Sequence, residues 1–262
     1  MGAVTDGAAA PAARASLEYV LRLADTALVL GQRLGEWCGK GPFLEEDIAL
    51  TNTALDLIGQ ARLLLTYAGE LEGRGRDEDD LAYFREAHEY RNLLLAEQLN
   101  GDFAATMVRQ VCLDAWQVEA YGQLAGSRDA QLAAIASKSL KESQYHLRHS
   151  AQWLVRLGDG TAQSHRRAQQ ALDDLWMWTG ELFEADAIDE ATLAAGIGFD
   201  PRAIRPAWDA RLDAVLAEAT LTRPAAQWMQ SGGRDGRHTE HLGYLLAEMQ
   251  SVRRAHPDAR TW

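Results

Sequence analysis

A row of acidic, histidine and hydroxyl side chains lies at helical spacing in the segment 130–157. Glu142 and His146 stand in the middle of this row, and apolar side chains stand at both of its ends. Because residues three and four positions apart share one face of a helix, the row is expected to face a protein core. Carboxylate and imidazole groups inside a helical bundle are typical of carboxylate-bridged di-metal centres. The members of the row are Ile135, Ser139, Glu142, His146, His149, Trp153 and Leu157.

Three further segments carry polar side chains on faces that are expected to be buried. The segment 45–72 is apolar almost all round, and a helix of that kind is buried on most sides. A buried carboxylate is costly unless it is paired, protonated or bound to a cation. Four helices could therefore surround a metal site. The polar residues concerned are Glu36 in the segment 16–38, Asp56 and Gln60 in the segment 45–72, and Asp114 in the segment 102–126.

The spacing of these residues departs from the pattern that a di-iron bundle requires. Such a site takes a Glu from each of two helices and a Glu-x-x-His pair from each of the other two. Gly59 stands three positions after Asp56. Tyr145 stands three positions after Glu142, so His146 comes one place late. We therefore predict a vestigial cluster that binds no metal and contains no catalytic or cofactor-binding residue.

Two alternatives to a vestigial cluster remain open at this point: a working di-metal site, and polar side chains on faces that are not buried. In a vestigial cluster, salt bridges and hydrogen bonds are expected to replace the metal. The sequence does not choose among the basic side chains of the same helices, which are Arg33, Arg62, Arg109 and Lys138.

Long helices joined by short loops are expected to hold these residues. Ala, Leu, Glu and Arg are abundant, and no segment alternates in the manner of a β-strand over a useful length. The chain is therefore predicted to be an all-α helical bundle. Residues 1–15 are predicted to form a disordered tail, and residues 16–262 a single domain. Further helices are expected over 81–99, 162–185, 206–221 and 240–254.

The bulk composition excludes several classes of function. The 262 residues carry a formal net charge of -12, which argues against binding to nucleic acid or to an anionic membrane surface. No apolar run has the length of a membrane span, and residues 1–15 lack the layout of a signal peptide. The two cysteines, Cys38 and Cys112, are too few for a disulfide framework. A cytoplasmic location is therefore expected.

The stretch GGRDGRHTEHLG at 232–243 is a second place where chemistry is conceivable. His238 and His241 have a His-x-x-His spacing, but no further ligand is spaced as a zinc site requires. Arg234 and Arg237 suit a contact with a nucleotide phosphate, such as that of a coenzyme A thioester, or with a carboxylate of a partner, although a solvated loop is the simpler interpretation.

Four stretches of the sequence resemble the C subunits of bacterial phenylacetyl-CoA epoxidases. The resemblance extends from about residue 17 to the C-terminus. It implies a ferritin-like helical bundle with extra C-terminal helices, in a cytoplasmic protein of aerobic phenylacetate catabolism. The stretches are RLGEWCG (33–39), NLLLAEQLNGDFA (92–104), SLKESQYHLRHSAQWLVRLGDGT (139–161) and GGRDGRHTEHLGYLLAEMQ (232–250).

The resemblance also implies partners and cofactors that lie outside this chain. The complex of that family is a multicomponent monooxygenase that epoxidises the ring of phenylacetyl-CoA with O₂ and electrons from NADPH. Its catalytic A subunit, which holds a di-iron centre, is expected to pair with this chain. A small B subunit, and a reductase with flavin and an iron–sulfur cluster, are expected to complete the hetero-oligomer. No cofactor is expected in this chain itself.

Three hypotheses follow for the function of the chain. The first is a structural, non-catalytic subunit that pairs with the di-iron subunit and stabilises it. The second is an autonomous di-metal oxidase or oxygenase of the ferritin-like class. The third is a binding module for coenzyme A thioesters. The missing Glu-x-x-His spacing favours the first.

Overall fold

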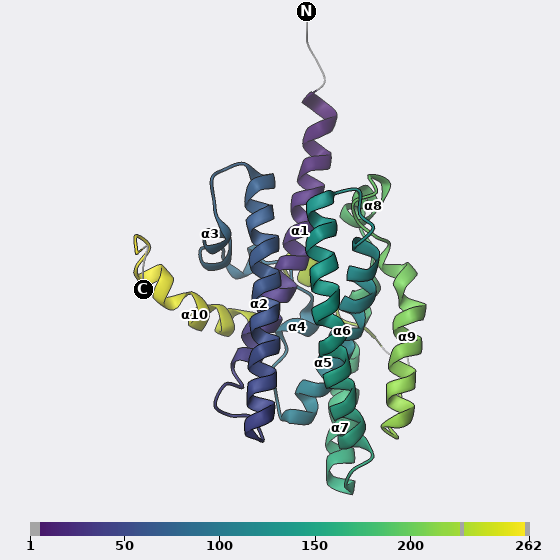
Figure 1. The fold of residues 1–262 in the computed structure, drawn as a ribbon. Coiled ribbons are helices and arrows are strands. Elements are labelled where there is room, and N and C mark those ends of the chain that lie inside the picture. The colour runs from purple at the N-terminus through teal and green to yellow at the C-terminus, as the bar shows by residue number, and fades with distance from the viewer. Residues whose placement is uncertain (1–5, 226–227, 260–262) are drawn as a thin grey trace, which may run out of the picture. The chain divides into compact units, whose positions relative to one another are not determined.

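The computed structural model describes residues 6–225 and 228–259, and over these the chain is helical and contains no β-strand (Figure 1). The predicted all-α fold class is therefore confirmed. The chain forms two compact units. The first unit comprises Met1–Leu93 and Gly232–Trp262, and the second comprises Leu94–Ser231. In the described part of the chain, no helix is both long enough and apolar enough to cross a membrane.

The first unit is built on a hairpin of two long helices, α1 (Asp6–Gly35) and α2 (Leu44–Glu72). Gly31 of α1 allows the two helices to approach closely. A Cβ atom at this position would lie only 3.2 Å from the carbonyl oxygen of Ala54 and 3.1 Å from the side chain of Ile58. Both helices carry buried apolar side chains, among them Ala24, Ala27, Leu28, Leu57, Ala61 and Leu64. The unit is completed by α3 (Glu78–Tyr83), a 3-10 turn (Ala87–Glu89) and α10 (Glu240–Ala255).

The N-terminal helix begins ten residues earlier than the sequence predicts. Residues 6–15, assigned from sequence to a disordered tail, are helical in the structure. Alanine has the highest helix propensity, and this stretch is rich in it. Residues 1–5 lie outside the described residues. The prediction of a single domain over 16–262 stays a prediction, and the two units are described separately below.

The second unit is built on α5 (Phe103–Leu124) and α6 (Ala130–Gly158). Both helices begin at an Asp that accepts a hydrogen bond from the backbone: Asp102 from Ala105 N at 3.0 Å, and Asp129 from Leu132 N at 2.9 Å. Such caps satisfy backbone donors that the first helical turn leaves open. The remaining helices are α4 (Leu94–Glu97), α7 (Ala162–Leu175), α8 (Ala187–Ala194) and α9 (Pro201–Glu218).

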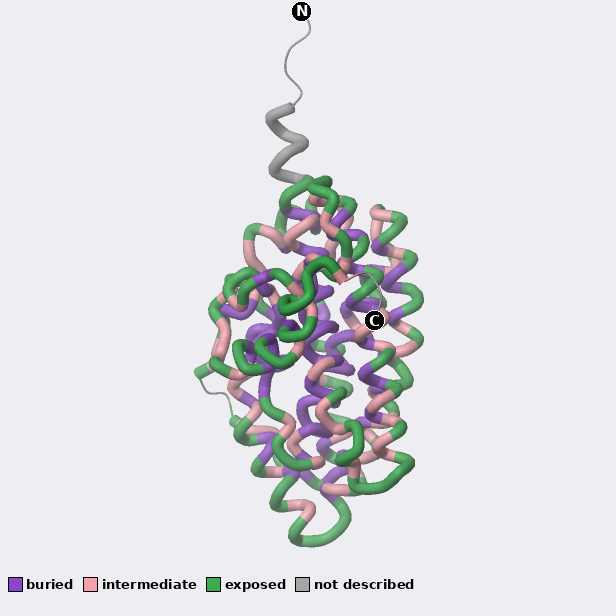
Figure 2. Tube along the Cα trace, turned by 90° about the vertical axis from the view of Figure 1, so that its left-hand side faces the viewer, coloured by how far each residue is buried: buried purple, intermediate pink, exposed green. Residues whose placement is uncertain are grey.

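Figure 2 shows buried positions running through the helices, and along α2 and α6 they alternate with exposed ones. This is the pattern of amphipathic helices around a core. In the second unit, the indole N–H of Trp208 donates a hydrogen bond to the carbonyl of Cys112 at 2.8 Å, which fixes α9 against α5. Trp208 is 1% exposed and also packs edge-on against Phe183, at 5.0 Å between ring centroids.

The prediction of one helix over 81–99 is wrong. The segment instead contains α3, the 3-10 turn and α4, joined by irregular backbone. Side chains of α1 capture backbone donors of this segment: Asp25 accepts from Arg91 N at 2.9 Å, and Thr26 accepts from Leu93 N at 3.1 Å. These donors are unavailable to a continuous helix, so tertiary contacts override the local helix propensity.

Three further elements differ from the prediction. The helix expected over 206–221 is α9, which spans Pro201–Glu218 and so begins five residues earlier. The helix expected over 162–185 ends at Leu175 and continues as 3-10 turns, Trp176–Trp178 and Gly180–Phe183. Helix α8 is not among the elements predicted from the sequence. This helix begins with a capping box, in which the side chains of Asp186 and Asp189 each accept from the backbone N–H of the other residue.

Candidate functional site

Glu36 does not lie on the buried face of α1, contrary to the expectation from sequence. The helix ends at Gly35, and Glu36 stands in the turn that follows, where it is half-buried. Arg33 Nη1 donates to Glu36 Oε1 at 2.6 Å, and Arg33 Nη2 donates to the carbonyl of His241 at 2.9 Å. Because Gly35 ends the helix one position earlier, Glu36 joins a salt bridge at the end of the hairpin.

Asp56 and Gln60 both lie on α2, in the first unit. Gln60 is fully buried, as expected, whereas Asp56 is only half-buried on the flank of the helix. Arg62, one of the cations considered for compensation, pairs with Glu78 at 3.1 Å. Gly59 offers no ligand atom in the turn that contains Asp56.

Asp114 lies in the second unit on α5 and is 1% exposed. Ser150 Oγ of α6 donates to Asp114 Oδ2 at 2.7 Å, and Gln110 Nε2 donates to Oδ1 at 3.5 Å. Burial raises the pKa of Asp114 to about 7, while the Ser150 hydrogen bond and the charge of Arg109 oppose that rise. The carboxyl is therefore held by a neutral hydroxyl and titrates near neutral pH.

Glu142 and His146 lie on α6, and they share its buried face only in part. His146 is 1% exposed, but Glu142 is half-buried on the flank and forms an ion pair with Lys138. The buried row of α6 runs through small hydroxyl side chains, and the row predicted from sequence is rotated toward Glu142 and His149. The polar members of the buried row are Ser139, Ser143, His146 and Ser150.

The cluster predicted from sequence is therefore split between the two units. Glu36, Asp56 and Gln60 belong to the first unit, and the other three residues belong to the second. Two of the four candidate cations supply a compensating charge: Arg33 pairs with Glu36, and Lys138 pairs with Glu142. Arg109 acts on Asp114 through its charge, and its guanidinium donates to the carbonyl of Gln98 and to Asn100 Oδ1.

These residues do not fit a di-iron centre. Within either unit, over residues 6–225 and 228–259, no three His, Cys, Asp or Glu side chains lie close enough together to hold a metal ion. Two of the expected acids are engaged by basic side chains, and the carboxyl of Asp114 accepts from a hydroxyl. The Glu-x-x-His pairs that supply the nitrogen ligands of such a centre are missing at Gly59 and Tyr145.

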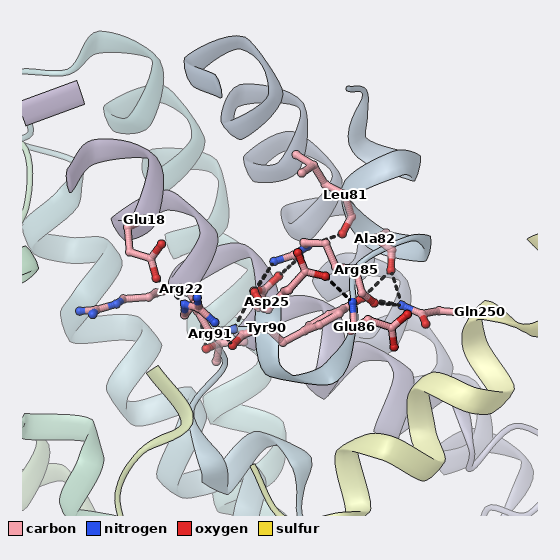
Figure 3. Close-up of polar contacts among 12 residues, drawn as sticks. Glu18, Arg22, Asp25, Leu81, Ala82, Arg85, Glu86, Tyr90, Arg91 and Gln250 are labelled. Atoms are coloured by element: carbon pink, nitrogen blue, oxygen red, sulfur yellow. Dashed lines mark hydrogen bonds and ion pairs between the residues drawn. The ribbon is translucent and has the colours of Figure 1, made fainter. Parts of the chain in front are cut away.

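A buried polar network in the first unit was not predicted from the sequence (Figure 3). Arg85 is 3% exposed and reaches Asp25, which is fully buried, through both terminal nitrogens. Its Nε also donates to the carbonyl of Leu81 at 2.5 Å, and its guanidinium carbon lies 4.4 Å from the ring centre of Tyr90. Burial lowers the pKa of Arg85, but the Asp25 carboxylate outweighs burial, so the pKa is raised overall.

Gln250 ties α10 into the same network. Its Nε2 lies within hydrogen-bond distance of the carbonyl of Ala82 at 3.1 Å, the carbonyl of Arg85 at 3.0 Å and Tyr90 Oη at 3.1 Å. The network therefore connects α1, the irregular segment after α3 and the C-terminal helix. The sequence offered one signal for this network, because Asp25 is an acid on an otherwise buried stretch of α1. Its partner Arg85 lies 60 positions away, so the sequence did not indicate the pair.

The glycine-rich loop at 232–239 packs on the irregular segment of the first unit. His238 Nε2 lies 3.0 Å from the carbonyl of Tyr90, and Arg237 pairs with Asp235 at 3.0 Å. Gly236 has a φ of 79°, and a Cβ there would lie 2.2 Å from the carbonyl of His88. Close backbone packing thus explains this glycine without a phosphate ligand.

A pocket of about 140 Å³ in the second unit combines aromatic rings with two arginines. Arg223 lies 5.0 Å from the ring centre of Trp176 and pairs with both Asp209 and Asp213. Arg205 lies 3.7 Å from Asp209 and 5.4 Å from the ring centre of Phe183. The arginine charges are therefore already balanced by carboxylates within this unit.

Comparison with known proteins agrees with the resemblance found in the sequence. The family model described as "Phenylacetic acid catabolic protein" matches residues 2–262. A relative from Escherichia coli (strain K12), the C subunit of 1,2-phenylacetyl-CoA epoxidase, is 55% identical over 239 residues, which are 91% of this chain and 96% of the relative. The chain therefore belongs to the phenylacetic acid catabolic protein family.

Proposed function

We propose that this chain is a structural, non-catalytic subunit of a phenylacetyl-CoA epoxidase, and that it pairs with the di-iron catalytic A subunit and stabilises it. The observation that carries this proposal is the state of the acids that a metal would need. Glu36 and Glu142 are engaged by Arg33 and Lys138, and Asp114 is engaged by the Ser150 hydroxyl. The likeness to the E. coli relative, which spans nearly the whole of both chains, supports the same assignment.

The remaining components of the assembly follow from this assignment. Iron would be held by the A subunit, whereas flavin, the iron–sulfur cluster and NADPH would be bound by the reductase. A small B subunit would complete the oxygenase. The chain would work in the cytoplasm, a location supported by its free cysteines, Cys38 and Cys112. Its part in catalysis would be to hold the A subunit in its active form.

Iron analysis of the separated components tests the proposal. The purified chain, loaded with ferrous iron and then desalted, is expected to retain far less than one iron per chain. It is also expected to consume no O₂ with a chemical reductant. Mixing it with the A subunit, the B subunit and the reductase should restore epoxidation of phenylacetyl-CoA. Two irons per chain together with reductant-dependent O₂ uptake would instead identify the chain as an autonomous di-metal oxidase.

A variant of the former ligand positions separates the two functions. Glu142→Gln combined with Gln60→Leu removes two side chains that a metal site would use. Turnover of the assembled complex is expected to stay within about twofold of the unaltered complex, because neither group touches the reacting atoms. A large loss of turnover, with association unchanged, would contradict the structural role.

A further inference from the structure

The pocket of the second unit that combines aromatic rings with two arginines has a rigid aromatic wall. The indole N–H of Trp208 donates to the carbonyl of Cys112 at 2.8 Å, which fixes that ring. Trp176 lies 6.1 Å from Trp208 and Phe183 lies 5.0 Å from it, measured between ring centroids. All three residues are buried. We call this cavity the aromatic pocket; its lining includes Trp176, Phe183, Arg205, Trp208, Arg223 and Met229.

Met229 adds an adaptable side chain to the lining of the aromatic pocket. A Cβ atom at Gly180 would lie 2.6 Å from the Cβ of Met229, so only glycine lets the two segments come this close. The backbone N–H of Gln230 donates to the carbonyl of Met177 at 2.8 Å and holds the segment in place. The flexible thioether of methionine adjusts to the shape of a neighbouring ring. The pocket therefore combines fixed aromatic rings with one apolar side chain that can adapt to a ligand.

The size of the aromatic pocket fits one six-membered ring. Its volume is about 140 Å³. An apolar protein cavity of about 150 Å³ binds benzene. Sites for larger ligands measure about 300–1,000 Å³. The ligand of this pocket is therefore much smaller than a coenzyme A thioester.

The two arginines of the pocket differ in their hydrogen bonds, although two carboxylates balance their total charge. Arg223 Nη1 donates to Asp213 Oδ1 at 2.7 Å, and its Nη2 donates to Asp209. Arg205 Nε lies 3.7 Å from Asp209, which is beyond hydrogen-bond distance. The guanidinium of Arg205 lies 5.4 Å from the ring centre of Phe183, so it stands beside the aromatic wall. Arg205 can therefore offer N–H donors to a ligand, whereas those of Arg223 are committed to carboxylates.

We propose that the aromatic pocket binds a small monocyclic aromatic carboxylate, with its ring against Trp176 and Trp208 and its carboxylate on the guanidinium of Arg205. Rings pack favourably against aromatic side chains, and arginine binds a carboxylate through two parallel hydrogen bonds. A cationic ligand would be repelled by the two arginines. This site is additional to the proposed pairing with the A subunit. Ligand binding is tested on the chain alone, so its failure would leave that pairing untouched.

Titration of the full chain with 4-fluorobenzoate, followed by ¹⁹F NMR, tests the proposal. Binding is expected to be saturable, with a dissociation constant on the order of 1 mM, because a ligand with few atoms gains little binding free energy. Benzoate should displace the probe. Acetate, which has the carboxylate without the ring, should not displace it at the same concentration. Displacement by acetate, or no saturable binding up to about 10 mM probe, would overturn the proposal.

An arginine pair on α9 tests the contact with the carboxylate. Arg205→Gln is expected to weaken 4-fluorobenzoate binding by at least about tenfold, because a charge-assisted pair of hydrogen bonds is lost. Arg202→Gln is the matched control. Arg202 is 58% exposed where Arg205 is 56%, and it pairs with Asp200 outside the pocket. Equal affinities of the two variants for the probe would refute the contact with Arg205.

A neutral probe separates this contact from a change in the shape of the pocket. 4-Fluorobenzyl alcohol has the ring but no charge. Its affinity should be the same for Arg205→Gln and for the unaltered chain. If Arg205→Gln lost both probes, the arginine would act by shaping the pocket, and the assigned contact would be wrong.

A methionine pair tests where the ring lies. Met229→Ala enlarges the aromatic pocket, so this variant is expected to bind 2-naphthoate at least about tenfold more tightly than the unaltered chain does. Met249→Ala is the control, because Met249 is also half-buried but lies on α10 in the first unit. It should leave 2-naphthoate binding unaltered. Equal affinities of the two variants for 2-naphthoate would place the ligand outside the aromatic pocket.

Discussion

Replacing Arg85 with alanine is expected to lower the free energy of unfolding by about 3–5 kcal/mol, because it leaves the carboxylate of Asp25 buried without its counter-charge. Asp25 is fully buried, and after the substitution the backbone N–H of Arg91 still donates to it at 2.9 Å but carries no charge. Urea unfolding of the full chain, followed by circular dichroism, measures the loss.

Lysine should not rescue this position. Arg85 uses its planar fork on Asp25, and its Nε on the carbonyl of Leu81. A lysine ammonium is a point charge and does not reproduce that set of donors. Arg85→Lys is therefore expected to recover only part of the stability lost in Arg85→Ala.

An exposed ion pair provides the control for the buried one. Arg211 pairs with Glu119 at 2.5 Å, and the arginine side chain is 47% exposed. Arg211→Ala should cost less than about 1 kcal/mol, because solvent screens exposed pairs. Similar losses for Arg85→Ala and Arg211→Ala would mean that the buried network does not hold the irregular segment in place.

Asp114→Asn is expected to stabilise the chain, increasingly so as the pH rises from about 4 to about 7. The pKa of Asp114 is raised to about 7 by burial, whereas a carboxyl in the unfolded chain titrates near 3.9. Between these values the folded chain binds one more proton than the unfolded chain, so stability falls as pH rises. Above about pH 7 both states are ionised, and the loss levels off.

The size of the effect follows from the difference between the two pKa values. About three pKa units correspond to about 4 kcal/mol at most. Asparagine removes this loss because it does not ionise, and its carbonyl oxygen can still accept from Ser150. Its amide can also donate to Gln110 Oε1, a buried atom that has no hydrogen-bond partner among the described residues.

The matched control has the same local arrangement at the surface. Gln170 Nε2 donates to Asp174 Oδ1 at 2.8 Å, four positions apart on α7, just as Gln110 does to Asp114 on α5. Asp174 is exposed. Asp174→Asn should change the free energy of unfolding by less than about 0.5 kcal/mol, as is usual for a substitution at the surface. A flat difference for Asp114→Asn would show that Asp114 does not retain a proton in the folded chain.

Local sequence signals were sufficient for the bounds of four helices, although not for the start of α1. The bounds of α2, α5, α6 and α10 fall within about two residues of those expected, because capping residues and glycines mark helix ends directly. The segment 81–99 was the main error. Its residues favour a helix, but Asp25 and Thr26 of α1 take its backbone donors. No local pattern contains that information.

The candidate site likewise contains some residues whose burial was predicted correctly and others whose burial was not. Asp114, Gln60 and His146 are buried as their helical spacing predicted, but Glu36 lies beyond a helix end and Glu142 lies on a flank. A helix end displaced by one position, or a face rotated by a fraction of a turn, changes which side chains are inside. Periodicity alone does not resolve differences of that size.

The sequence by itself therefore determined the all-α class, the family and the absence of the Glu-x-x-His spacing, since each of these depends on residues close together in the chain. Only the tertiary structure decided which partners the buried acids take. Arg85 reaches Asp25 across 60 positions, and Ser150 reaches Asp114 across 36. It also left Leu44, Ile48 and Leu55 of α2 exposed, where an apolar helix alone predicted burial on most sides. Partners and exposure depend on how the helices pack, and packing involves residues far apart in the sequence.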